Sequence, residues 1–272
     1  MNRLPAETED KRLGFLIPIL EEACASFKIL GTEKVWWRGH SDKDYRLQPM
    51  ILRGKYRDHD EYNLITQFEQ EAPIRYADWP ESRDKRLLLM QHYGLPTRLL
   101  DWSRSLLAGL YFALRNKDHD DRDGCLWALS PNRLNLSQVG NNAIFTTESP
   151  EVKKRIDDAF TRPEERTRVE GVLATIGPQI DLRMLVQLSC FTIHATGTSP
   201  IEELGMHQDF VSPVVVPQES KPYLRQMVGI LGTLESQLFP DLGSLASFLK
   251  GNKDFYSIKP PLEETGTEPE SE

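Results

Sequence analysis

An arginine stands in the middle of a segment with the pattern of a buried strand, and this constrains the fold more than any other feature of the sequence. The segment is KVWWRGH, residues 34–40. Because side chains alternate across a strand, Trp36, Arg38 and His40 are expected on one face. Burying a guanidinium is costly unless a partner compensates its charge. The fold must therefore give Arg38 a structural carboxylate or leave it to bind an anionic ligand.

Hydrophobic periodicity in the rest of the chain predicts helices and strands in one mixed α/β domain. Helices are predicted at 11–30, 60–79, 81–93, 150–160, 222–232 and 241–252, with a further helix that Ser103 would cap. The helix over 60–79 is expected to end or kink at Pro73. Strands are predicted at 34–40, 124–130, 190–196 and 211–217, while 94–103 is expected to be extended and irregular. We therefore expect an N-terminal helix within 1–30, a domain over 31–250, and an acidic, disordered tail over 251–272.

Composition argues against several classes of protein and of site. The formal net charge is −8, so the chain lacks the overall positive charge of typical DNA-binding proteins. Its three cysteines lie far apart, which predicts a reduced, cytoplasmic protein without a structural zinc site. No apolar run reaches the roughly 18 residues of a membrane span, and the N-terminus lacks the apolar region of a signal peptide. We expect no membrane partner and no metal.

The block QHYGLPTRLLDWSRSLLAGLYFAL, residues 91–114, places polar residues between apolar ones just before a predicted helix. Its glycine and proline favour a turn, and Thr97, Arg98 and Asp101 follow within the next few positions. Two interpretations are open. Arg98 could pair with Asp101 in a tight loop, or the three residues could form the polar floor of a cleft.

Two later blocks also place polar residues beside apolar anchors. In RMLVQLSCFTIH, residues 183–194, Arg183 and Gln187 would meet on one helical turn, although Gln187 could be an ordinary surface residue. In ESQLFPDLGSLASFL, residues 235–249, Glu235 is either a solvated carboxylate or a catalytic one. The chain has no GxGxxG, P-loop or GxSxG motif, so the chemistry tied to those motifs has no support.

Together with WWRGHSDKDYRLQPMILR at 36–53, these blocks resemble the FRG domain family over residues 30–250. The family is named after a Phe/Tyr-Arg-Gly motif, which stands here as Trp37-Arg38-Gly39. Its pattern is similar to that of ADP-ribosyltransferases. The resemblance implies an α+β fold, a single domain with small split β-sheets flanked by helices, and NAD as the substrate. It also implies a role as a bacterial toxin or phage-defence effector.

The resemblance further implies catalytic roles for Glu235 and Arg38. Glu235 would stabilise the positive charge that builds on the ribose as nicotinamide leaves, and would orient or deprotonate the acceptor. Arg38 would grip the diphosphate with its planar fork, and Gly39 would let the ligand approach the backbone. The residues expected to bind the cofactor are Arg38, Gly39, His40, Tyr93, Thr97, Arg98, Asp101 and Gln187.

Individual roles follow for several of these residues. Arg98 would be a second phosphate ligand, held in place by Asp101, and Thr97 would contact a ribose hydroxyl. Tyr93 and Trp36 offer aromatic faces that could stack on a base, or that could simply pack in the core.

Other interpretations remain open at this point. The same fold could be a non-catalytic module that binds a nucleotide or a partner protein. A nucleic-acid-binding protein or nuclease is a weaker alternative. Arg38, Asp101 and Glu235 could also form an internal ion-pair network. The acceptor of the ADP-ribose, a protein or a nucleic acid, is not identified by the sequence, and an antitoxin or regulatory protein is a candidate partner.

Overall fold

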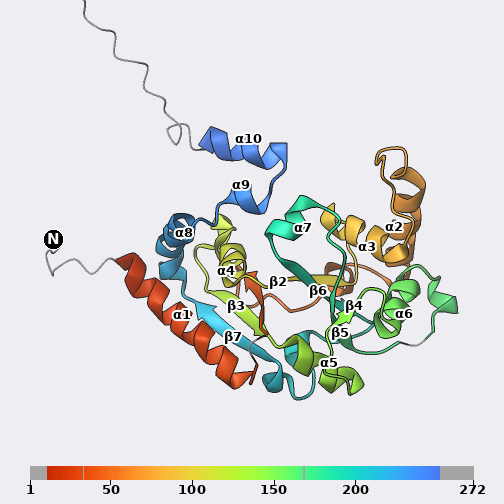
Figure 1. The fold of residues 1–272 in the computed structure, drawn as a ribbon, viewed down its shortest axis with the longest axis horizontal. Coiled ribbons are helices and arrows are strands. Elements are labelled where there is room, and N and C mark those ends of the chain that lie inside the picture. Colours follow the sequence, from red (N-terminus) through yellow and green to blue (C-terminus); the bar gives the residue numbers. More distant parts are fainter. Residues whose placement is uncertain (1–10, 33, 168, 252–272) are drawn as a thin grey trace, which may run out of the picture.

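A seven-stranded sheet runs through the computed structural model, which describes residues 11–32, 34–167 and 169–251 (Figure 1). The strand order is β4-β5-β6-β2-β1-β3-β7, with β4 and β5 parallel and the other neighbours antiparallel. The strands are β1 (Trp36–His40), β2 (Leu99–Ser103), β3 (Gly124–Leu129), β4 (Phe145–Thr146), β5 (Val172–Ile176), β6 (Ser189–His194) and β7 (Val211–Val216).

The two halves of the sheet meet at a single residue pair. β1 pairs with β3 over its whole length, and β2 does the same with β6, but β1 and β2 share only the pair Trp37 and Ser103. The prediction of an α+β domain is confirmed. The prediction of separate small sheets is wrong, because this pair joins both halves into one sheet. Beyond the pair, β1 and β2 diverge.

Ten α-helices surround the sheet in the described part of the chain. They are α1 (Lys11–Ile29), α2 (Asp58–Glu71), α3 (Arg83–His92), α4 (Leu106–Leu114), α5 (Pro131–Val139), α6 (Pro150–Ala159), α7 (Leu182–Val186), α8 (Lys221–Ile230), α9 (Glu235–Leu238) and α10 (Leu242–Gly251). The N-terminal helix α1 is part of the domain, since its buried side chains join the same core as α8, α4 and the β3–β7 half of the sheet (Figure 1).

Three large apolar clusters fill the space between helices and sheet, and a small fourth one lies between α4 and the segment that follows α8. The first lies between α1, α4, α8 and the strands β1, β3 and β7. The second lies between α2, α3, α6 and the strands β2, β5 and β6. The third covers the opposite face with α5 and loop residues, and it buries Trp36 and Trp102. Because β1 and β2 diverge between the first two clusters, α3 and α4 border a gap on one face of the sheet.

Most of the predicted helices and strands are confirmed, and two predictions need correction. Segment 94–103 is not irregular throughout, because Leu99–Ser103 forms the central strand β2. Ser105 rather than Ser103 caps α4, since its hydroxyl accepts from the amide of Ala108 at 3.2 Å. Four further elements, α5, α9, β4 and β5, were not predicted from the sequence. The predicted tail lies almost wholly outside the described residues.

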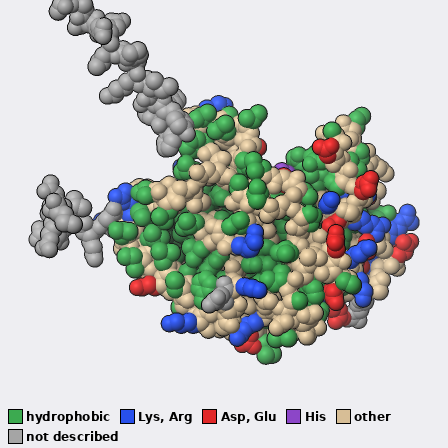
Figure 2. Space-filling view, in the orientation of Figure 1, with side chains coloured by type: hydrophobic (Ala, Val, Ile, Leu, Met, Phe, Trp, Pro, Cys, Tyr) green, Lys and Arg blue, Asp and Glu red, His purple; other side chains and the backbone are tan. Residues whose placement is uncertain are grey.

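The surface carries charge of both signs. Figure 2 shows Lys, Arg, Asp and Glu side chains gathered where α2 and α6 lie, and hydrophobic side chains over the part near α1 and α8. No single sign of charge dominates the face in view. Within the described residues, no helix has the length and apolar character that a membrane crossing requires.

Candidate functional site

A cleft opens where the two halves of the sheet diverge, and it encloses about 190 Å³. Its floor is formed by β1 and β2, and its walls come from α3, α4, α7 and the start of β6. Aromatic rings and a few polar groups share the lining, which is made of Trp37, Arg38, Gly39, Leu88, Gln91, His92, Asp101, Trp102, Ser103, Phe112, Arg183, Met184, Gln187, Ser189 and Phe191. Mostly apolar walls with a few convergent polar groups are typical of a small-molecule site.

Arg38 lies in the gap between the diverging strands. One guanidinium nitrogen donates to the main-chain carbonyl of Asp101 at 2.5 Å, and Nε donates to Nε2 of His40 at 3.0 Å. Among the described residues, no carboxylate forms an ion pair with Arg38. Burial lowers the pKa of Arg38 to about 10, with Arg53 adding to this and Asp101 opposing it. The side chain therefore stays cationic at neutral pH, and its charge is left for an anion.

His40 holds Arg38 in place through a hydrogen bond but does not itself line the cleft. Its Nδ1 faces the carbonyl of Tyr45 at 3.1 Å, so this nitrogen carries the proton and Nε2 accepts from Arg38. Burial lowers the pKa of His40 to about 3, and Arg38 adds to the effect. A neutral imidazole in this tautomer fixes the position of the guanidinium. The structure thus gives His40 the place of a positioning residue.

Asp101 is the only carboxylate among the described residues that line the cleft. Its side chain accepts a hydrogen bond from Nε2 of Gln91 at 2.7 Å, and Oε1 of Gln91 accepts from the hydroxyl of Thr97 at 2.5 Å. Thr97 is buried and also accepts from the amide of Leu99. Thr97 therefore holds Gln91, which holds Asp101, and Thr97 has no surface in the cleft itself.

The far wall is built by α7 together with the segment that follows α8. The guanidinium of Arg183 stacks on the ring of Phe239, 4.6 Å from its centroid, and among the described residues it forms no ion pair. The side-chain amide of Gln187 donates to the carbonyl of Leu238 at 2.8 Å, and its main-chain carbonyl accepts from Ser103 at 2.7 Å. Arg183 and Gln187 both line the cleft, and the main-chain amide of Gln187 donates to the carbonyl of Arg183 at 3.0 Å, while the side chain of Gln187 contacts Leu238 and that of Arg183 contacts Phe239.

Gly39 has a packing role that was not predicted from the sequence. A Cβ at this position would lie 2.0 Å from the carbonyl oxygen of Gly109 and 2.3 Å from the amide nitrogen of Ala113. A Cβ at Gly109 would in turn lie 2.8 Å from Cβ of Trp37. The glycine is therefore needed because β1 and α4 pack backbone to backbone. Gly39 also lines the cleft, and the approach of a ligand to its backbone stays a prediction.

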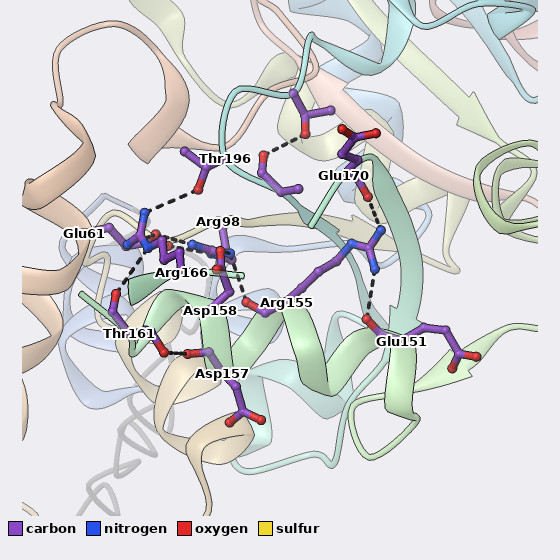
Figure 3. A network of polar contacts seen from close by, with 12 residues as sticks. Glu61, Arg98, Glu151, Arg155, Asp157, Asp158, Thr161, Arg166, Glu170 and Thr196 are labelled. Atoms are coloured by element: carbon purple, nitrogen blue, oxygen red, sulfur yellow. Dashed lines mark hydrogen bonds and ion pairs between the residues drawn. The ribbon is translucent and has the colours of Figure 1, made fainter. Parts of the chain in front are cut away.

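Arg98 is buried in an ion-pair network away from the cleft, and the expected pair with Asp101 does not form (Figure 3). Its side chain is 1% exposed and binds both carboxylate oxygens of Glu61, at 2.9 and 2.6 Å, and one of Asp158, at 2.9 Å. A further nitrogen donates to the carbonyl of Arg155. Arg166 approaches Glu61 at 3.5 Å. All three nitrogens of the Arg98 guanidinium donate to protein atoms, so Arg98 ties α2 and α6 to the start of β2. No nitrogen of Arg98 is left to bind a phosphate.

Three other predicted residues also lie outside the cleft lining. Glu235 begins α9, is about half exposed, and pairs with Arg115 at 3.4 Å. Tyr93 is 62% exposed beside His92. Trp36 is buried in the third apolar cluster. The network of Arg38, Asp101 and Glu235 does not form either, since Arg38 contacts the main chain of Asp101 and Glu235 contacts Arg115.

Sequence reasoning missed several residues that the fold brings to the site. Gln91 and His92 come from the last turn of α3, at the start of the block that holds the polar motif, and their position at a helix end facing a turn was a usable signal. Arg183 was noted for its spacing but given no role. The aromatic walls Phe112 and Phe191 carry no local signal, because their sequence pattern is that of ordinary core.

The model of the FRG domain matches residues 33–122, which supports the resemblance seen in the sequence. The matched region runs from β1 to beyond α4, so it contains Arg38, Gln91 and Asp101 but neither Gln187 nor Glu235. No curated protein and no solved structure matches the chain. Within the described residues, no group of three or more His, Cys, Asp or Glu side chains is placed to hold a metal ion.

Proposed function

We propose that the cleft binds NAD and that the protein is an NAD-dependent ADP-ribosyltransferase acting on a macromolecule, in the setting of a toxin or phage-defence effector. The observation that carries this proposal is Arg38, a cation without an ion-pair partner in the described chain, fixed by His40 and the carbonyl of Asp101 within an aromatic-walled cleft. Such a group is suited to bind phosphate oxygens bidentately.

The cleft supplies several of the groups that cleavage of the nicotinamide–ribose bond would use. Nicotinamide leaves as a neutral molecule with the electron pair of the broken bond, and positive charge builds on the ribose carbon. The acceptor then forms the new bond to that carbon and loses a proton. A fixed negative charge near the ribose lowers the barrier. Asp101 is placed for this, because it lies in the cleft and Gln91 holds its carboxylate.

This assigns to Asp101 the role that the sequence suggested for Glu235. The carboxylate of Glu235 faces Arg115 outside the cleft. Aromatic faces in the cleft, such as Trp37 and Phe112, offer contacts for the nicotinamide or adenine ring.

Nicotinamide release tests the proposal directly. Purified protein is incubated with NAD, with and without cell lysate as the source of acceptor, and nicotinamide is followed by NMR. We expect release by the wild type, loss of release in Arg38→Ala and Asp101→Asn, and release close to wild type in Glu235→Gln. Loss of release in Glu235→Gln with activity retained in Asp101→Asn would reverse the assignment of the carboxylate.

A non-catalytic module that binds a nucleotide is the second candidate, favoured by the position of Glu235 outside the cleft. The same samples distinguish it. An NAD-induced rise in melting temperature that Arg38→Ala abolishes, without nicotinamide release under any condition, would identify a binding module. Neither a rise nor release would exclude NAD as the ligand.

A further inference from the structure

His92 and Asp181 form a histidine–carboxylate pair at the edge of the cleft, and the proposed function gives this pair no role. Nδ1 of His92 lies 2.8 Å from Oδ2 of Asp181. That oxygen is buried and has no other partner among the described residues. The two side chains come from different elements, because His92 ends α3 and Asp181 caps α7, where Oδ1 accepts from the amide of Met184 at 2.8 Å. The pair therefore fixes the imidazole of His92 against the start of α7.

The contact with Asp181 determines which nitrogen of His92 can act on a ligand. An ionised carboxylate only accepts hydrogen bonds, so Nδ1 carries the proton of the neutral ring and Nε2 holds a free electron pair. His92 lines the cleft and Asp181 does not. Because the two ring nitrogens point in nearly opposite directions, Nε2 is directed toward the cleft. Within the described part of the chain, Nε2 has no hydrogen-bond partner of its own.

His92 also lies close to the carboxylate that the proposed function uses. The residue before it, Gln91, donates to the side chain of Asp101 at 2.7 Å, and all three residues line the cleft. The cleft thus holds two groups suited to different tasks. Asp101 offers a fixed negative charge, and His92 offers a base that can take up a proton.

We propose that His92 is the general base of the cleft, oriented by Asp181, and that the acceptor of the ADP-ribose is a hydroxyl group. This rests on the proposed function, because it names the acceptor class of the same site. Nicotinamide leaves with the electron pair of its bond to the ribose carbon, and the acceptor oxygen forms the new bond to that carbon. The hydroxyl proton moves to Nε2 of His92. The imidazolium that forms is stabilised by the carboxylate of Asp181.

A hydroxyl is the kind of acceptor that requires such a base. It is too weak an acid to lose its proton before it attacks, so an adjacent base must take the proton during the reaction. A carboxylate acceptor attacks as an anion and has no proton to lose. The hydroxyl can belong to a macromolecule or to water, and with water the reaction is the hydrolysis of NAD.

Azide as an alternative acceptor tests the base directly, because this anion attacks carbon without losing a proton. Nicotinamide release is followed by NMR with NAD alone, with added cell lysate and with added sodium azide. Release by the wild type with NAD alone identifies water as the acceptor, and release only with lysate identifies a macromolecule. We expect His92→Gln to lower this release by at least about 100-fold, and azide to restore it.

Asp181→Asn is the second variant, because asparagine keeps an oxygen that can cap α7 while the carboxylate is removed. It should lower release by at least about tenfold, since the base is no longer held in place, and azide should restore it too. His59→Gln is the matched control. It removes a histidine that faces a carboxylate, Glu164, at 3.5 Å on the exposed surface outside the cleft, and release should be unchanged. Azide should not restore release in Asp101→Asn, because that carboxylate acts on the breaking bond.

The outcomes separate this inference from the function on which it rests. Release close to the wild type in His92→Gln, or a loss that azide does not restore, would overturn the assignment of the base while leaving cleavage of NAD intact. A product that neutral hydroxylamine cleaves would be an ester to a carboxylate, and would overturn the hydroxyl acceptor. No release by the wild type in any of the three mixtures would overturn the proposed function and this inference with it.

Discussion

Nε of Arg38 donates a hydrogen bond to Nε2 of His40, 3.0 Å away and two residues along the same strand. Because both side chains leave the same face of β1, the imidazole lies beside the guanidinium and fixes it from the protein side. The pairing of a cation with a neutral base leaves Arg38 without an ion-pair partner among the described residues. It is this arrangement, rather than an ion pair, that makes Arg38 the centre of the candidate site.

Replacing Arg38 should weaken ligand binding without unfolding the protein. We expect Arg38→Ala to lower the affinity for NAD by at least about tenfold. Loss of its hydrogen bonds to Asp101 and His40 costs about 1 kcal/mol each, but removal of a partly buried, unpaired charge offsets this. The free energy of unfolding, measured in urea, should therefore change by less than about 1 kcal/mol. A large destabilisation would show that Arg38 is a structural residue. Arg38→Lys keeps the charge but not the fork, and should bind NAD with intermediate affinity.

Replacing Arg98, in contrast to Arg38, should strongly lower the free energy of unfolding. Arg98→Ala leaves the buried carboxylates of Glu61 and Asp158 facing each other without their shared cation. Breaking a buried pair from one side typically costs about 3–5 kcal/mol, so we expect a loss of stability of this size, or insoluble protein.

Arg83→Ala is the matched control for this effect. Arg83, at the start of α3, pairs with Asp157 of helix α6, the neighbour of Asp158, but both side chains are about half exposed. An exposed pair contributes at most about 1 kcal/mol. If chemical denaturation shows similar losses for Arg83→Ala and Arg98→Ala, burial does not set the strength of the network.

The partners of Arg98 could not be predicted from the residues near it in the sequence. The pairing of Arg98 with Asp101 seemed natural because the two are close in the chain. In a strand, residues three apart point to opposite faces, and the actual partners Glu61 and Asp158 are 37 and 60 positions away. Such pairs depend on how α2 and α6 pack, which no local pattern contains.

Elements with strong periodicity, such as α1 and α8, were predictable because each buries one continuous face. The central strand β2 was missed because the glycine and proline before it and the charge of Asp101 within it are typical of loops. Asp101 is exposed in the structure because it faces the cleft. Asp101, whose charge made β2 difficult to predict as a strand, is thus one of the residues that form the site.

The close packing of β1 on α4 predicts that Gly39→Ala is severely destabilising. Its Cβ would meet main-chain atoms of Gly109 and Ala113, which cannot rotate away. We expect a loss of about 3 kcal/mol or more, at the upper end of overpacking effects. Gly14→Ala is the control, because a Cβ there meets nothing within 4 Å. It lies inside helix α1, where alanine should stabilise by up to about 1 kcal/mol. Thermal unfolding of both variants measures the difference, and a well-folded Gly39→Ala protein would contradict the packing argument.

His40, on strand β1, makes the free energy of unfolding depend on pH. Burial lowers the pKa of His40 to about 3, and Arg38 adds to the effect, whereas an unfolded histidine titrates near pH 6.5. Between these values the unfolded chain binds more protons, so the free energy of unfolding falls as pH falls below about 6.5, by up to about 1.4 kcal/mol per pH unit. His40→Gln keeps one donor and one acceptor but cannot titrate. Urea unfolding at pH 7 and pH 5 should therefore show a smaller loss for His40→Gln than for the wild type, by about 2 kcal/mol. His59→Gln, at an exposed position, should follow the wild type, and an unchanged loss in His40→Gln would mean that His40 is not held neutral in the fold.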